Sequence, residues 1–153
     1  GQEIKLPDTM QNKVILVSDI YPGIGALGGI HAGLVASDCR YNLALAADMP
    51  FLNPGLLRYL VEISLGFDVV MPRVSGNIEP LHAVYSRDCL PAIQEQLDRN
   101  ERQIRSFLKR VKVRYVEEAE VDKFDPRHLS FFNVNTPDEL AKANEIAAEI
   151  GEN

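Results

Sequence analysis

Apolar residues along this chain recur with two different periods, and together these predict alternating strands and helices. Short apolar or β-branched runs bounded by turn-forming residues predict strands. We expect them at residues 13–18, 41–47, 67–71, 79–85, 111–116 and 131–134. Apolar residues confined to one helical face predict helices. We expect these at residues 30–36, 53–64, 87–99, 103–110 and 137–150.

The order of these elements predicts an α/β domain. Strands and helices alternate in the first half and mix in the second, which favours a three-layer sandwich around a mostly parallel mixed sheet. The nearly all-apolar run at residues 41–47 predicts a central parallel strand covered on both faces. The alternating apolar and basic residues at 111–116 predict an antiparallel or edge strand. Ligands of such sheets bind at the carboxyl ends of the strands.

Two helix starts carry clear capping signals. Asn53 precedes Pro54, which predicts an N-cap followed by proline at the first helical position. Thr136 and Glu139 flank Pro137 and Asp138 in the pattern of a capping box. We therefore expect helices to begin directly after Asn53 and Thr136.

Composition narrows the class of protein. The 153 residues fit one domain, residues 1–153, with 46% hydrophobic and 25% charged residues. The net charge of −6 disfavours nucleic acid as a partner, and no apolar run approaches the roughly 18 residues of a membrane span. Cys39 and Cys89 lack metal-ligand spacing and are expected to be reduced thiols of a cytoplasmic protein.

Asp48 is the first candidate for chemistry. It follows the apolar run at residues 41–47, so its carboxylate is expected at the ligand-binding edge of the sheet. A carboxylate there can hold Mg²⁺ together with substrate phosphates and water. The alternative is an Asp that caps the next turn, although Asn53 already caps the following helix.

Two further segments carry candidate ligand groups. Asp19 opens a glycine-rich loop over residues 19–29, which is either a close-approach site for an anion or a plain tight turn. Asn133 and Asn135 flank Val134 and place two amides on one side of an extended segment. Such amides bind a polar heterocycle or phosphate oxygens, or simply form turns.

Histidines and basic residues give weaker signals. His31 and His82 form no cluster and are expected to be structural. Six basic residues lie close together in the sequence, either as a solvated face or as a rim for a phosphorylated substrate. They are Arg102, Arg105, Lys109, Arg110, Lys112 and Arg114.

Four blocks, taken together, resemble the molybdenum cofactor guanylyltransferases. They are residues 19–29 (DIYPGIGALGG), 47–52 (ADMPFL), 79–85 (EPLHAVY) and 133–140 (NVNTPDEL), in family order. The resemblance implies a Rossmann-like fold of the nucleotide-diphospho-sugar transferase type and Mg²⁺-dependent transfer of GMP from GTP to molybdenum-carrying molybdopterin. It also implies transient contacts with molybdoenzyme maturation proteins.

The resemblance assigns roles to four residues. It makes Asp48 the catalytic Mg²⁺ ligand and a GTP contact, and Asp19 a second GTP contact. Asn133 and Asn135 match the paired residues expected beside the pterin. Alternative readings are the same fold with another nucleotide or acceptor, such as cytidylyl or sugar-phosphate transfer, and a homologue that binds nucleotide or a partner without turnover.

One family block has no counterpart here. Members of the family begin with a strand and a Leu-Ala-Gly-Gly loop ending in lysine, which nothing in this chain matches. We therefore expect an N-terminally incomplete domain that lacks a βα unit and is inactive alone. Residues 13–18 or 41–47 would then form a strand with an unpaired apolar edge.

Overall fold

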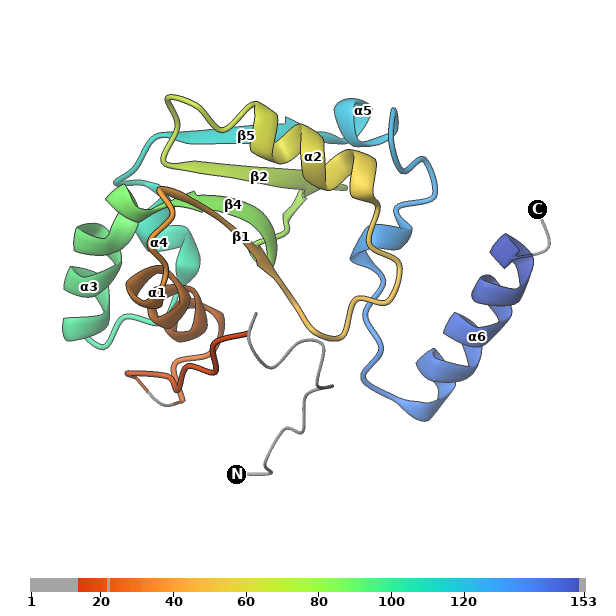
Figure 1. Ribbon diagram of the computed structural model, residues 1–153, viewed down its shortest axis with the longest axis horizontal. Coiled ribbons are helices and arrows are strands. Elements are labelled where there is room, and N and C mark those ends of the chain that lie inside the picture. The colour runs from red at the N-terminus through yellow and green to blue at the C-terminus, as the bar shows by residue number, and fades with distance from the viewer. Residues whose placement is uncertain (1–13, 22, 152–153) are drawn as a thin grey trace.

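The computed structural model describes residues 14–21 and 23–151. Within these residues, one mixed sheet has the strand order β1-β4-β2-β3, and β5 also pairs with β2 (Figure 1). The strands are β1 (Tyr41–Leu45), β2 (Val69–Val74), β3 (Asn77–Ile78), β4 (His82–Ser86) and β5 (Val113–Glu117). Each is rich in the β-branched, aromatic or aliphatic residues that suit a pleated, half-buried surface.

The strand directions place three carboxyl ends on one edge of the sheet. β4 is antiparallel to both β1 and β2, whereas β5 is parallel to β2. Consequently β1, β2 and β5 run in the same direction, while β3 and β4 run against them. The expected α/β class with a mixed sheet is confirmed, although only the β2–β5 pair is a parallel pairing among the described strands.

The position of β1 differs from the expectation. Instead of a central parallel strand over residues 41–47, β1 lies at the edge, ends at Leu45 and pairs only with antiparallel β4 among the described strands. Its residues are correspondingly half-buried or exposed. Its apolar composition suits coverage on both faces, but in the described residues no strand lies along its other edge.

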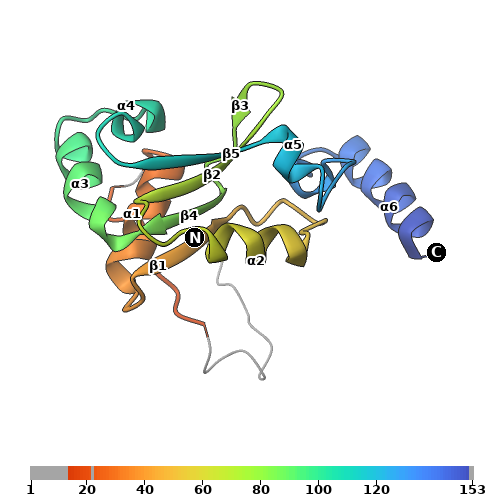
Figure 2. The same ribbon diagram turned by 90° about the horizontal axis from the view of Figure 1, so that it is seen from above.

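Helices cover both faces of the sheet, which confirms the three-layer architecture (Figures 1 and 2). One apolar cluster joins α1 (Ala26–Ala36), α3 (Leu90–Asp98) and α4 (Ile104–Leu108) to side chains such as Tyr85. A second joins α2 (Pro54–Glu62) and α5 (Glu118–Val121) to the opposite face, around Val84. Successive residues of β4, Val84 and Tyr85, thus point into different layers, as strand geometry requires.

Three short or terminal elements complete the described chain. They are the 3₁₀ turns η1 (Arg87–Cys89) and η2 (Leu129–Phe131) and the helix α6 (Pro137–Gly151), which stands beside the sheet rather than on it (Figure 1). Across the described residues, none of the helices has the length and apolar character needed to cross a bilayer. Cys39 is exposed and Cys89 is buried, and both are free thiols, as expected.

Two expected strands are wrong. Residues 14–18 form no strand, and their apolar side chains face solvent, with Ile15 78% and Leu16 63% exposed; Lys13 lies outside the described residues. Residues 131–134 form the end of η2 and an extended segment without a ladder partner. Local β propensity is insufficient in both cases because a strand also needs a neighbouring edge to satisfy its backbone groups.

Other boundaries moved for local reasons. The helix expected at residues 30–36 begins earlier, at Ala26, so the glycine-rich loop is shorter than residues 19–29. The two capping predictions are confirmed. The side chain of Asn53 accepts a hydrogen bond of 3.0 Å from the Leu56 N–H, and α6 begins with the predicted box. β5 is an edge strand, as expected, but it is parallel to its neighbour.

Candidate active site

Asp48 lies just beyond the carboxyl end of β1. The strand ends at Leu45, and one further ladder-like bond, from the Ala46 N–H to the Leu81 carbonyl at 3.0 Å, holds the chain beside β4. Asp48 follows in a turn and is half-buried. Within the described residues its carboxylate makes no hydrogen bond or ion pair with another side chain. The group is therefore available to a ligand at this edge.

The segment of Asn133 and Asn135 passes directly beside Asp48. The main-chain N–H of Val134 donates a hydrogen bond of 2.9 Å to the main-chain carbonyl of Asp48. Both asparagines are exposed. Because this bond anchors the residue between them, the segment that carries the two asparagines lies beside the turn that carries the carboxylate. The structure thus brings together two blocks that are distant in the sequence.

Glu139 fixes the second half of this segment. Its carboxylate accepts main-chain N–H bonds from Asn135 at 2.8 Å and from Thr136 at 2.9 Å. The Thr136 hydroxyl in turn accepts the Glu139 N–H at 3.2 Å, which completes the capping box. These bonds, first of all the one from Asn135, lower the pKa of Glu139. The sequence predicted the capping box, but it did not predict the hydrogen bond from the Asn135 N–H to Glu139.

Asp19 lies against the first turns of α1. A side-chain carbon placed on Gly29 would be 3.9 Å from the Asp19 Oδ1. Gly28 allows the loop to close here, since a side-chain carbon there would come within 3.2 Å of the Tyr21 carbonyl. Gly25, at φ +74°, is the N-cap, and within the described residues no side chain caps this helix end. Its free amide groups can therefore receive an anion.

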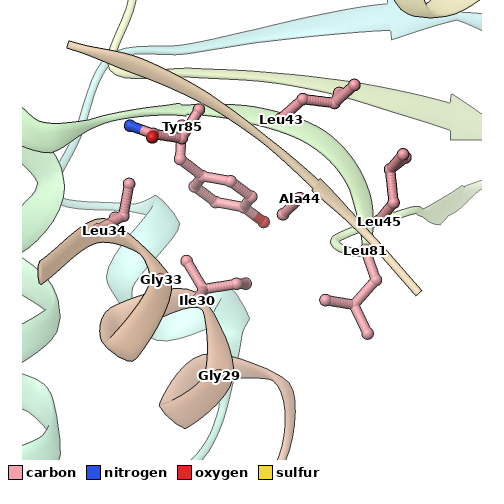
Figure 3. A pocket seen from close by; sticks show the side chains of 10 residues that line it. Gly29, Ile30, Gly33, Leu34, Leu43, Ala44, Leu45, Leu81 and Tyr85 are labelled. Carbon is pink, nitrogen blue, oxygen red and sulfur yellow. The ribbon is translucent and has the colours of Figure 1, made fainter. Parts of the chain in front are cut away.

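An apolar hollow of about 410 Å³ lies between α1 and the strands β1 and β4 (Figure 3). Gly29 and Ile30 of α1 lie across it from Ala44, and Leu81 lines one end (Figure 3). The hollow runs along the edge of β1 that no described strand occupies. It also shows that the start of α1, with Asp19, lies at the carboxyl end of β1, on the same edge of the sheet as Asp48.

Glu79 is a candidate that sequence reasoning named only as part of a motif. It precedes β4 and is tied to β2 by its N–H, which donates to the Pro72 carbonyl at 3.1 Å. Burial raises the pKa of its carboxyl group. No described residue pairs with its side chain. The sequence signal that could have identified Glu79 was a carboxylate placed between a tight hairpin and the next strand.

His31 and His82 are both buried side chains. His82 is fully buried, neither ring nitrogen has a hydrogen-bond partner among the described residues, and burial lowers its pKa to about 4. Its ring packs edge-on against Phe131 with centroids 5.0 Å apart. His31 is buried in α1 and its Nε2 lies 2.8 Å from Gln94 Oε1. Both side chains serve packing.

The side chains at this edge limit the kind of metal site that can form there. Among the described residues no three His, Cys, Asp or Glu side chains come together as a metal cage. Mg²⁺, however, is commonly held by one or two carboxylates together with substrate phosphates and water. A single free carboxylate at Asp48, close to a helix end that favours phosphate, fits such an open site and not a closed one.

These features define an α/β domain with a candidate ligand site at the carboxyl ends of its strands. The sequence matches the family described as MobA-like NTP transferase domain over residues 4–117.

Individual relatives agree with the family match. A probable molybdenum cofactor guanylyltransferase of Pelotomaculum thermopropionicum is 42% identical over 86% of this chain and 64% of its own length. A molybdenum cofactor guanylyltransferase of Desulfosudis oleivorans is 37% identical over 90% of this chain and 68% of its own length. The chain therefore spans about two thirds of these relatives.

A solved structure gives the same result. The molybdopterin-guanine dinucleotide biosynthesis protein A of Archaeoglobus fulgidus superposes with a TM-score of 0.74 and 34% identity, over 86% of this chain and 67% of that one. The chain belongs to the MobA-like NTP transferase family, on the branch of the molybdenum cofactor guanylyltransferases.

Proposed function

We propose that the protein transfers GMP from GTP to molybdenum-carrying molybdopterin, forming molybdopterin guanine dinucleotide. The observation that carries the proposal is the hydrogen bond from the Val134 N–H to the Asp48 carbonyl. It joins a carboxylate suited to a nucleotide-bound metal with two amides suited to a second substrate. The names of the relatives supply the identity of both substrates.

The reaction is a substitution at phosphorus. A terminal phosphate oxygen of molybdopterin forms a bond to the α-phosphorus of GTP, and the bond between the α-phosphorus and the bridging oxygen breaks. The electron pair leaves with pyrophosphate. Catalysis then consists of positioning and electrostatic stabilisation, without a covalent enzyme intermediate. Mg²⁺, when bound, neutralises charge on the triphosphate.

Different residues along the sheet edge bind the metal, the nucleotide and the pterin. Asp48 holds Mg²⁺ and contacts GTP. Asp19 contacts GTP beside the uncapped start of α1, whose amides favour the phosphates. Asn133 and Asn135 hydrogen-bond the pterin, whose ring offers both donors and acceptors to amide groups. GTP and molybdopterin are the small-molecule partners, and the reaction belongs in the cytoplasm, to which the two free thiols are suited.

Nucleotide choice provides the first test. We expect GTP with Mg²⁺ to raise the melting temperature of the full-length protein more than CTP or UTP does, because a ligand stabilises the fold it binds. Equal shifts for the three nucleotides would reject the guanine assignment and favour another transferase of this fold. A shift without product from GTP and molybdopterin would favour a homologue that binds without turnover.

The metal role is tested by substitution. Asp48→Asn keeps the size of the side chain but removes its charge, and should lower the rate of transfer by about a hundredfold or more. Asp38→Asn is the matched control, because Asp38 is an exposed carboxylate at the amino end of β1. Transfer by Asp48→Asn at the rate of the control would remove the proposed metal ligand.

A further inference from the structure

Another hollow, distinct from the apolar one beside β1, lies at the carboxyl edge of the sheet, on the face covered by α4. It has a volume of about 320 Å³, at the lower end of the roughly 300–1,000 Å³ usual for small-molecule sites. Three cationic side chains line it, Arg73, Arg105 and Lys109, together with Tyr115 and apolar Ile78 and Leu108. A concentration of positive charge is unexpected in a chain with a net charge of −6.

The structure separates the six basic residues of this stretch of sequence. Arg110 pairs with Glu95, Arg114 pairs with Glu120 at 2.7 Å, and Lys112 lies over the ring of Phe67. Arg102 is exposed and lies outside the hollow. Of the six, only Arg105 and Lys109 line the hollow.

Arg105 and Lys109 are cations without a counter-charge. Within the described residues neither makes a hydrogen bond or an ion pair. They are spaced four residues apart at α4, where like charges face each other and destabilise the helix by repulsion. A bound anion would relieve this repulsion.

Arg73 supplies a rigid wall of the hollow. Its Nε and Nη2 groups donate to both carboxylate oxygens of Glu117, at 3.1 and 2.5 Å. The guanidinium lies over the Tyr115 ring, 4.6 Å from its centroid. A guanidinium has five N–H donors, so three remain after these two bonds. The side chain is thus fixed in orientation and can still donate to an oxyanion.

The hollow lies on the edge that carries the proposed site, but on another strand. Arg73 pairs with Ile78 of β3, and the next residue, Glu79, is bonded to the Pro72 carbonyl. β4 separates β2 from β1, so the hollow lies roughly 10 Å across the sheet from the end of β1. That span is too large for the reacting phosphate and suits a more distant group of a bound substrate.

We propose that Arg73, Arg105 and Lys109 form an oxyanion site for the acceptor, separate from the reacting phosphates. This inference rests on the proposed function for the identity of the acceptor. The shared chemistry is a compact group of negatively charged oxygens, which Arg and Lys bind through charge-assisted hydrogen bonds. Because the phosphate of the acceptor is the reacting group, the source that fits is an oxo-metal group carried by the acceptor.

Binding of inorganic anions to the whole chain tests the site without any turnover. Backbone amide signals of residues 73–78 and 104–109 are followed by NMR during titration with molybdate and, separately, with phosphate. Sodium chloride at matched ionic strength corrects for screening. We expect saturable shifts at these amides. Tighter binding of molybdate than of phosphate assigns the site to the oxo-metal group of the acceptor, and tighter binding of phosphate would overturn that assignment.

Paired variants make the test specific. Arg105→Gln and Lys109→Gln are surface substitutions and should each weaken binding about tenfold, the loss expected for one charge-assisted hydrogen bond. Lys123→Gln removes an exposed cation outside the hollow and should leave affinity unchanged. Shifts that do not saturate, that chloride reproduces, or that persist in the Arg105→Gln/Lys109→Gln double variant would overturn the site.

Kinetics separate this inference from the proposed function. In the transfer reaction the double variant should raise the KM for the acceptor and leave the KM for GTP unchanged. Equal KM values for both proteins would overturn the role in acceptor binding while the guanylyl transfer itself stands. Conversely, anion binding without any transfer by the full-length protein would count against the proposed function and not against the oxyanion site.

Discussion

The main-chain N–H of Val134 and the main-chain carbonyl of Asp48 form a hydrogen bond of 2.9 Å between two loops. A second set of contacts closes around it. The Ala46 N–H bonds to Leu81, and the neighbouring residue, His82, packs on Phe131 at the start of the Val134 segment. The carboxylate and the two asparagine amides are therefore held relative to each other by the sheet and not by either loop alone.

Removal of the Val134 N–H should uncouple the two loops. Val134→Pro lacks this donor, whereas Val134→Ala keeps it and loses only side-chain contacts. We expect the proline variant to lose about 1 kcal/mol of unfolding free energy beyond the alanine variant, the usual worth of one hydrogen bond. Urea unfolding measures this difference. The proline variant should also show a higher KM for the acceptor, and identical kinetics in the two variants would refute the coupling.

Glu139 should hold Asn135 only while it is ionised. Its pKa is lowered in the folded protein, so its contribution to stability is present above the unfolded-state pKa and is lost as the pH falls through the folded value. Glu139→Gln should accordingly lower the melting temperature near neutral pH, and the difference from the unsubstituted protein should shrink in acid. Glu145→Gln, at an exposed position of the same helix, is the control. A difference that is constant with pH would contradict this role.

The sequence predicted the parts of this site that depend on local signals. The caps at Asn53 and Thr136 follow from short-range hydrogen bonding, and both are present. The end of an apolar run placed Asp48 just beyond a strand, because a short bounded apolar run predicts a strand from a few residues. The α/β class followed from the order of elements alone.

The rest depended on contacts that no local pattern contains. Residues 14–18 have a strand composition but no described neighbour, so their backbone has no ladder to join. The direction of β5 is set by its pairing with β2, and the alternation of its residues is compatible with either direction. Likewise, six clustered basic residues look alike in sequence, and only the tertiary structure gives partners to Arg110, Lys112 and Arg114 and places Arg105 and Lys109 at one hollow. The four predicted site residues, Asp19, Asp48, Asn133 and Asn135, lie along one edge of the sheet, and their roles remain predictions.

His82 should make the fold sensitive to mild acid. Burial lowers its pKa to about 4 from an ordinary value of 6.5, so the unfolded chain takes up a proton first as the pH falls. Stability should therefore decline between pH 6.5 and pH 4, by about 3 kcal/mol in total from this group.

His82→Phe isolates that contribution. The two nitrogens of His82 have no partners, so an apolar ring of similar shape should be tolerated at neutral pH. Urea unfolding at several pH values should show a flatter dependence for the variant between pH 6.5 and pH 4. Parallel curves for the two proteins would assign the acid sensitivity to other groups.

The exposed run at residues 14–17 should promote association of the chain. Val14, Ile15, Leu16 and Val17 are all open to solvent, and β1 offers an edge that no described strand occupies. Consecutive β-branched and aliphatic residues without charge are typical of segments that pair between molecules, and a lysine within them opposes that pairing. Ile15→Lys should therefore slow the growth of light scattering on incubation. Leu65→Lys is the matched control because Leu65 is 79% exposed and lies outside both the run and β1. If both lysine variants slow scattering equally, added charge alone accounts for the effect; a slower rate only in Ile15→Lys identifies the run as the associating segment.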